Sequence, residues 1–331
     1  MTASDAPVSF LPDDVTRLAS YPLAVLGPTA SGKSALALTL HDLLGDWTGA
    51  AVELVSIDSM QVYRGMDIGT AKPTRDEQAR VAHHLIDLVG ADQRFTVAEF
   101  QAKARTVLDD VVARGNIPLL VGGTGLYLRA VIDDLDIPGQ YPEVREQLDE
   151  HDTAELFAQL QRDDPQAATR MEPTNRRRIL RALEVTVGSG QPFSTYGPGL
   201  ETYPESRFVQ VALDMERPEV DRRIAERYRQ QLADGFLDEV RCLAEQPLSR
   251  TARQALGYRE LLAHLDDGVP LDEAVDLAVV RTRKFARRQM RWFRRDPRLR
   301  WFPTPADPIA VLRWWRDQAR IRSDSDQPGL A

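Results

Sequence analysis

The chain has 331 residues, of which 43% are hydrophobic and 28% are charged, which is typical of a soluble globular protein. A single cysteine excludes an internal disulfide, and five scattered histidines offer no zinc-ligand spacing. Because no secretory leader and no stretch of ~20 apolar residues is present, we expect a cytoplasmic protein without a membrane span.

The predicted elements begin after a polar stretch, residues 1–20, which we expect to be a flexible tail. An apolar run at 23–26 leads into GPTASGKS and a helical pattern, and a second apolar run, 52–57, ends at Asp58. Helical spacing at 95–114 precedes an apolar strand at 117–121. This alternation predicts an α/β fold, a P-loop NTPase-like parallel sheet flanked by helices. Ligands of such sheets bind at the carboxyl ends of the strands.

The character of the sequence changes between residues 131 and 206. Polar helical segments at 143–163 and 175–187 are followed by a stretch rich in glycine, proline and serine. We expect a mostly helical insertion here, inside a catalytic core formed by residues 21–130 and 207–305. The remaining predicted elements are a core strand at 207–215, helices at 218–245 and 271–295, and a C-terminal tail at 306–331.

Residues 27–34 satisfy the pattern G-x-x-x-x-G-K-[ST] between a strand and a helix, the context that supports a phosphate-binding loop. Backbone N–H groups and the helix N-terminus attract phosphate oxygens, Lys33 adds a charge, and Ser34 can ligate Mg²⁺. This nucleotide-binding (ATP-binding) motif predicts a diphosphate or triphosphate ligand but does not identify ATP. The predicted phosphate-binding residues are Gly27, Pro28, Thr29, Ala30, Ser31, Gly32, Lys33 and Ser34.

An ATPase or GTPase normally has a second apolar strand that ends in an acid, which holds Mg²⁺. Here the candidate strand at 117–121 runs into Gly122 and Gly123 and carries no carboxylate. Asp58, at the end of the strand 52–57, fits a general base for kinase or transferase chemistry. The alternative for Asp58 is an Asx cap of the turn that follows.

Four segments resemble the tRNA dimethylallyltransferases, also called tRNA isopentenyltransferases. They are GPTASGKS at 27–34, DSMQVYRGMDIGTAKP at 58–73, LVGGTGLY at 120–127 and RALEV at 181–185, and their order and spacing agree from about residue 23 to 293. With one cysteine, the chain resembles the bacterial type, which lacks the zinc finger of many eukaryotic relatives.

The resemblance implies transfer of a dimethylallyl group from its diphosphate to the exocyclic amine of the tRNA adenine next to the anticodon on its 3′ side. The P-loop would hold the diphosphate, Asp58 would accept the amine proton, and Thr29, Lys33 and Mg²⁺ would stabilise the departing oxygen. Arg223 or Arg227 would also reach the diphosphate, unless they are ordinary surface arginines. A transferase acting on free adenine nucleotide and a P-loop small-molecule kinase remain as alternatives.

The resemblance also implies a set of tRNA contacts. Asp58, Ser59, Met60, Gln61 and Thr124 would surround the extruded base, with Gln61 reading one of its edges. Relatives often carry Asn-Asp before the basic run in the insertion, whereas this chain has Thr174-Asn175, which leaves a base contact by an aspartate in doubt. Segment 254–259 could equally be an ordinary helix start. The other expected contacts are Arg145, Thr174, Asn175, Arg176, Arg177, Arg178, Gln254, Gly257, Tyr258 and Arg259.

The charge distribution of the helix predicted at 271–295 is evidence on nucleic-acid binding that does not depend on the family resemblance. The net charge of −8 alone argues against such a partner, yet residues 281–300 hold ten basic residues and one acid. On a helical wheel the lysine and arginine residues at 281–295 fill one half of the helix and the apolar residues fill the other. Gln289 lies on the apolar half, so we predict that it is buried and hydrogen-bonded. Because no acid interrupts the basic half of the helix, we predict that Arg283, Arg287 and Arg288 contact the phosphates of the RNA. We expect a monomer whose partner is tRNA.

Overall fold

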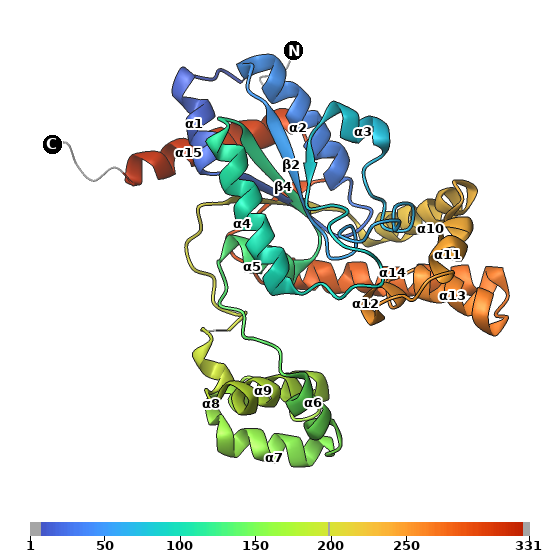
Figure 1. The fold of residues 1–331 in the computed structure, drawn as a ribbon. Coiled ribbons are helices and arrows are strands. Elements are labelled where there is room, and N and C mark those ends of the chain that lie inside the picture. Colours follow the sequence, from blue (N-terminus) through green and yellow to red (C-terminus); the bar gives the residue numbers. More distant parts are fainter. Residues whose placement is uncertain (1–7, 198, 327–331) are drawn as a thin grey trace. The chain divides into compact units, whose positions relative to one another are not determined.

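The computed structural model describes residues 8–197 and 199–326, and it divides them into two compact units (Figure 1). The smaller unit is Asp133–Pro204, and the larger one comprises the residues before and after it. The smaller unit corresponds to the insertion expected at 131–206. Each unit has a hydrophobic core of its own.

The larger unit is built on one sheet of parallel strands. Within the described residues the strands are β1 Leu23–Leu26, β2 Val52–Ile57, β3 His83–His84, β4 Ile117–Gly122, β5 Val209–Asp214 and β6 Arg300–Pro303. Their order is β3-β2-β4-β1-β5-β6. In the register, Gly122 pairs with both Ile57 and Leu26, so the carboxyl ends of β2, β4 and β1 lie side by side. The predicted parallel α/β sheet is confirmed.

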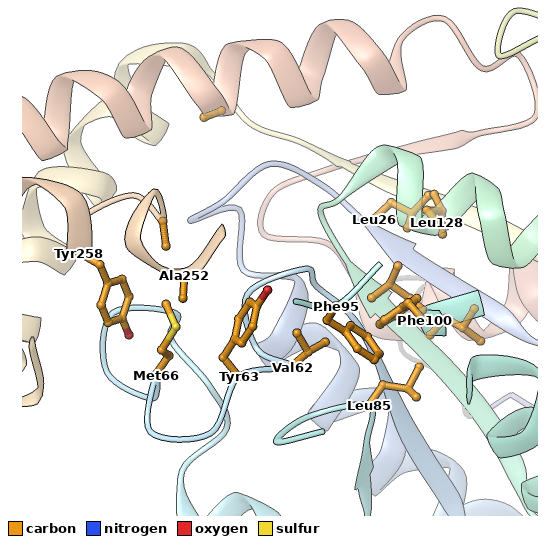
Figure 2. Packing of buried hydrophobic residues seen from close by; sticks show 14 of the residues in the cluster. Leu26, Val62, Tyr63, Met66, Leu85, Phe95, Phe100, Leu128, Ala252 and Tyr258 are labelled. Atoms are coloured by element: carbon orange, nitrogen blue, oxygen red, sulfur yellow. The ribbon is translucent and has the colours of Figure 1, made fainter. Parts of the chain in front are cut away.

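Helices cover both faces of this sheet (Figure 1). The helices of the larger unit are α1 Pro12–Ser20, α2 Lys33–Thr48, α3 Arg75–Arg80, α4 Val97–Ala113, α5 Gly125–Ile132, α10 Arg217–Ala233, α11 Phe236–Ala244, α12 Arg250–Arg253, α13 Tyr258–Asp267, α14 Leu271–Phe293 and α15 Pro308–Ser325. Alternate residues of each strand point to opposite faces. In β1, Leu23 and Val25 therefore pack with α1, α2 and α15, whereas Ala24 and Leu26 belong to the core with α4, α5, α10, α11, α13 and α14 (Figure 2).

The two predicted tails are wrong for the residues that the structure describes. Residues 12–20 form α1 and 308–325 form α15, and the two helices pack against each other. Leu18 and Trp315 are both buried, and the Trp315 indole donates a hydrogen bond of 2.8 Å to the backbone oxygen of Tyr21. The physical reason is that each helix has an apolar side, which removes a large hydrophobic area from water only when the helix docks. Residues 1–7 and 327–331 lie outside the described residues.

The helix predicted at 218–245 is two helices, α10 and α11, separated at Asp234 and Gly235. Gly235 has φ 98°, a left-handed conformation that glycine adopts without steric cost, and the chain turns there. The predicted strand at 207–215 and helix at 271–295 are confirmed as β5 and α14. The short strands β3 and β6 were not predicted.

The smaller unit is helical, as expected. Its elements are α6 Pro142–Asp149, α7 Thr153–Asp163, α8 Pro165–Thr169, α9 Arg176–Ser189 and the 3₁₀ turn η1 Phe193–Thr195. The single helical segment predicted at 143–163 is divided because the Asp152 carboxylate caps a new helix, accepting the N–H of Glu155 at 2.9 Å. Leu156, Leu160, Ile179 and Leu183 form the centre of its core. In the described part of the chain, no helix is long and apolar enough to cross a membrane.

Candidate active site

The predicted phosphate-binding loop joins β1 to α2. Ala30 and Gly32 have positive φ, 66° and 89°, so the backbone folds back on itself before the helix starts at Lys33. Ser31 is fully buried, and its hydroxyl has no hydrogen-bond partner among the described residues. A Cβ on Gly27 would lie 2.6 Å from that hydroxyl, so only glycine fits there. Free helix N–H groups and an unpartnered hydroxyl are groups suited to bind an anion.

Two half-buried cationic side chains, Lys33 and Arg227, lie at this loop. Burial lowers the pKa of Lys33 to about 8, although the negative charge of Asp58 opposes the shift. Burial likewise lowers the pKa of Arg227, whose Nε is buried without a partner in the described residues. Arg227 also acts electrostatically on Lys33. Both side chains are half-buried, so their positive charges have lost part of their hydration at some cost, and a bound anion would relieve that cost.

Arg223 lies one helical turn before Arg227 on α10. A Cβ built on Gly32 would lie 3.8 Å from the Arg223 Nη1, so this side chain borders the loop. Its Nε donates to Glu219 at 2.7 Å. The structure therefore brings together Lys33, Arg223 and Arg227, the three basic residues predicted for the diphosphate.

Asp58 follows the last residue of β2 and is half-buried. Its Oδ1 accepts the backbone N–H of Met60 at 2.8 Å and of Gln61 at 3.4 Å, which is the Asx turn considered as an alternative. For Oδ2, no protein partner is found among the described residues. Both roles are thus compatible, because one oxygen shapes the turn and the other stays available as a base.

Residues around Asp58 form a connected loop structure. The Thr124 hydroxyl, beyond the end of β4, accepts the N–H of Ser59 at 3.4 Å. Gln61 donates its amide to the oxygens of Thr70 and Ala71 and accepts the Ser56 hydroxyl at 2.7 Å. These contacts commit the Gln61 side chain to the protein, so the structure gives it a part in holding the loop rather than in reading a base.

Gln289 on α14 connects three parts of the site. Its Oε1 accepts the N–H of Thr29 at 2.9 Å, and its Nε2 donates to the oxygen of Gly123 at 2.7 Å. The prediction that Gln289 is buried and hydrogen-bonded is confirmed. The sequence did not indicate its partners, which are the phosphate loop and the end of β4. A Cβ on Gly123 would lie 2.6 Å from the Gln289 amide, which explains the glycine.

The basic residues of α14 fall into two groups. Arg281 pairs with buried Glu260 at 2.5 Å, and Arg283 donates to the Asp221 backbone oxygen at 2.9 Å, so both are held by the protein. Lys284, Arg288 and Arg291 are exposed, and for none of them is an acidic partner found among the described residues. Arg287 is half-buried beside them. The free positive charge of α14 is therefore concentrated at 284–291.

The segment 254–259 corrects two expected tRNA contacts. Tyr258 is 1% exposed, and Gly257 is buried with its Cβ position 2.9 Å from the Phe236 ring, so neither can contact a nucleic acid. Arg259 pairs with Glu260 at 3.0 Å and donates to Gln254. The glycine is needed for its positive φ of 86° at the start of α13, as the alternative interpretation held.

In the smaller unit, several predicted residues also have internal partners. Arg145 pairs with Glu184 at 3.1 Å, Arg176 donates to the backbone oxygens of Asp149 and His151, and Asn175 caps α9. Thr174, Arg177 and Arg178 are exposed. Only Arg177 and Arg178 among these basic residues are without a partner in the described part of the chain.

Comparison with known proteins gives a consistent result. The profile of the family described as "IPP transferase" matches residues 61–296. The tRNA dimethylallyltransferase of Bifidobacterium animalis subsp. lactis is 45% identical over 84% of this chain and 81% of its own length, and that of Salinispora tropica is 44% identical over 97% and 100%.

Solved structures are similar over most of the chain. The tRNA isopentenylpyrophosphate transferase of Bacillus halodurans is 34% identical, with a TM-score of 0.65 over 92% of this chain and 99% of its own. A eukaryotic dimethylallyltransferase acting on tRNA has a TM-score of 0.70 over 93% of this chain and 80% of its own. At 23% identity, the latter likeness shows the fold alone.

Proposed function

Because the chain belongs to the IPP transferase family, we propose that it transfers a dimethylallyl group from dimethylallyl diphosphate to the exocyclic amine of the adenine 3′-adjacent to the anticodon in tRNA, releasing pyrophosphate. Two features together carry the proposal: Asp58 has one carboxylate oxygen without a partner among the described residues, and Lys33, Arg227 and the loop 27–34 form a half-buried cationic cradle on which the Asp58 charge acts. One group is suited to take a proton and the other to hold an anion that leaves.

In the proposed reaction the adenine nitrogen attacks the allylic carbon next to the diphosphate. A C–N bond forms while the C–O bond to the diphosphate breaks, and the amine proton passes to the Asp58 Oδ2. The amine is a weak nucleophile because its lone pair is delocalised into the ring, so a base contributes ~10²–10⁴-fold. Lys33, Arg227 and Thr29 would stabilise the negative charge on the departing pyrophosphate.

Mg²⁺ belongs to the proposal as the ion that neutralises the diphosphate. The Ser34 hydroxyl is exposed in the first turn of α2, where it can serve as one ligand. Among the described residues no cluster of three or more acidic, histidine or cysteine side chains could hold a metal by itself. This fits Mg²⁺, which usually keeps several waters and is held by substrate phosphates with one or two protein ligands.

The two alternatives lack support from specific observations. A P-loop kinase normally holds its metal with an acid after a second core strand, whereas β4 is followed by Gly123 and Thr124. A transferase for free adenine nucleotide has no need for the helical unit or for the uncompensated charges at Lys284, Arg288 and Arg291. These charges suit the phosphate backbone of an RNA. A monomer acting in the cytoplasm remains part of the proposal.

The experiment is incubation of the purified chain with labelled dimethylallyl diphosphate, an anticodon stem–loop RNA and Mg²⁺, without ATP. Label should enter the RNA at the adenine beside the anticodon, with one pyrophosphate released per label. An RNA with guanine at that position is the matched control and should stay unlabelled. Two parallel incubations test the alternatives. If free AMP is added and takes up the label in preference to the RNA, the nucleotide-acting alternative is favoured. If ATP replaces dimethylallyl diphosphate and its terminal phosphate is transferred to a small acceptor, the kinase is favoured.

A further inference from the structure

The loop that follows Asp58, residues 62–73, contains no helix or strand; its own backbone bonds are a bridge between Tyr63 and Val89 and a few turn bonds, such as the Ala71 N–H to the Ile68 oxygen. The N–H groups that these bonds leave unpaired need acceptors elsewhere. Glu239 on α11 supplies the acceptor for three of them. Its carboxylate accepts the N–H groups of Asp67 at 2.9 Å, Ile68 at 2.7 Å and Gly69 at 3.2 Å. One side chain thus fixes three consecutive peptide groups that are about 170 positions distant in sequence.

Other contacts make this attachment rigid. The Tyr258 hydroxyl donates to Glu239 at 2.6 Å, and burial raises the pKa of Tyr258 well above its usual value, so this donor keeps its proton. A Cβ on Gly69 would overlap the rings of Phe236 and Tyr258, so the loop backbone lies directly against them. Gln231 on α10 donates to the Ile68 oxygen at 2.5 Å. Figure 2 shows Tyr258 on the same side of the core as Met66 and Tyr63 of the loop.

The attachment continues to the catalytic carboxylate. Gln61 bonds to the oxygens of Thr70 and Ala71, the residues directly after the segment that Glu239 holds. The backbone N–H of Gln61 in turn donates to Asp58 Oδ1. Hydrogen bonds therefore lead from α11 through 67–71 to the turn that orients Asp58, and none of these groups belongs to the phosphate loop.

We propose that Glu239 is a positioning residue for the transfer reaction, which holds loop 62–73 so that the Asp58 turn keeps its catalytic geometry; this role rests on the proposed function. Glu239 touches neither reacting atom. Its hydrogen bonds are charge-assisted and hence strong, so neutralising the carboxylate weakens all of them together. A displacement of ~1 Å at the reacting groups costs about 10²-fold in rate.

The test is Glu239→Gln, which keeps the size of the side chain and removes its charge. We expect kcat to fall by about 10–100-fold, while KM for dimethylallyl diphosphate stays within about twofold of the native value. Hydrogen exchange at the amides of Asp67, Ile68 and Gly69 should become faster. The matched control is Asp238→Asn on the same helix, an exposed carboxylate that pairs with Arg241, which should leave all three quantities unchanged.

A second variant covers the case in which Glu239→Gln does not fold. Tyr258→Phe keeps the ring against Gly69 and removes one donor to Glu239, so it should lower kcat in the same direction by less. A native chain that fails to label the RNA overturns the proposed function. With an active native chain, the positioning role is overturned on its own by an unchanged kcat in both variants. It is also overturned if KM for dimethylallyl diphosphate rises as steeply as kcat falls, because that is the pattern of general damage to the site.

Discussion

The two oxygens of Asp58 have different surroundings. Oδ1 is engaged by the N–H groups of Met60 and Gln61, whereas Oδ2 has no protein partner in the described residues. A carboxylate anchored in this way loses little freedom on meeting its substrate, because the turn already fixes its direction. A substitution at Asp58 can therefore keep the turn and remove the proton acceptor.

The separating substitution is Asp58→Asn. An asparagine Oδ1 can accept the same two N–H groups, so the turn should persist, while the amide cannot take a proton. We expect kcat to fall by about 10²–10⁴-fold, the usual contribution of a general base, with thermal stability and RNA affinity near native values. Single-turnover kinetics with labelled dimethylallyl diphosphate would measure it. Retention of the native rate would exclude Asp58 as the base.

If Lys33 binds the diphosphate as proposed, that binding should depend on pH. Its pKa of about 8 in the folded free protein means that the ammonium loses its proton as pH rises through that value. We expect kcat/KM for dimethylallyl diphosphate to fall by up to about tenfold per pH unit above about 8. At saturating diphosphate kcat should decline at higher pH than kcat/KM, because the bound anion favours the charged lysine. A flat kcat/KM profile to pH of about 9.5 would contradict the desolvation of Lys33.

The free energy of unfolding should also depend on the protonation of Lys33, but it should rise with pH where kcat/KM falls. The folded-state pKa of Lys33 lies below its ordinary value of 10.5, because burial disfavours the charged form. Between those two values the unfolded chain binds more protons than the folded one. Deprotonation of Lys33 therefore contributes to a rise, not a fall, in the free energy of unfolding across that window.

At the scale of elements, α14 has one side that faces the candidate active site and another that faces solvent. Gln289 faces inward and joins the phosphate loop to the end of β4, while Lys284, Arg288 and Arg291 face solvent. Helical periodicity alone predicted this division, because a residue's place on the wheel decides whether it faces the core. The wheel could not show that Arg281 and Arg283 are held by Glu260 and Asp221, since those partners lie on other helices.

Substitution of the exposed arginines of α14 tests whether this helix binds the RNA. Replacing Arg288 and Arg291 by alanine should weaken RNA binding and reduce the slope of log K against log salt by about 0.7–0.9 for each RNA phosphate that the protein no longer neutralises. KM for dimethylallyl diphosphate should not change. Arg75→Ala, an exposed arginine on α3, is the control. Equal effects of the α14 pair and of Arg75 would show only a general loss of positive charge.

The loop 58–73 marks the limit of what the sequence could predict. Its motif identified the family and placed Asp58 correctly at the end of β2. The parts played by Gly69 and Lys72 were not predicted, because they depend on distant residues. Gly69 lies against Phe236 and Tyr258, and Lys72 is buried with its ammonium on the Tyr63 oxygen at 2.9 Å and on Asp87 at 2.6 Å. The error at Tyr258 has the same cause, since a motif does not show which of its members face inward.

At the scale of the whole molecule, the chain leaves the larger unit and returns to it at neighbouring points. The Ser206 hydroxyl donates to the backbone oxygen of Ile132 at 2.8 Å, and β5 then enters the sheet beside β1. The helical unit between them has its own core, built around Leu156 and Ile179. Each unit thus has a hydrophobic core of its own, as separately folding domains do.

This arrangement predicts that residues 133–204 can be replaced by a short glycine–serine linker. The ends to be joined are already in contact, so closing the loop needs only a few residues and little extra chain entropy. The excised protein should retain a cooperative thermal transition and bind dimethylallyl diphosphate with native affinity, because Lys33, Arg227 and loop 27–34 all lie in the larger unit.

Its affinity for the anticodon stem–loop should fall, since the free charges of Arg177 and Arg178 are removed with the helical unit. A full-length chain with Arg177→Ala and Arg178→Ala separates this charge effect from the loss of the unit itself, and should reproduce part of the decrease. Isothermal titration with each ligand in turn would measure both affinities. Native RNA binding by the excised protein would place the RNA surface entirely on the larger unit, whereas loss of diphosphate binding in a protein that still unfolds cooperatively would contradict the assignment of the diphosphate site to Lys33, Arg227 and loop 27–34.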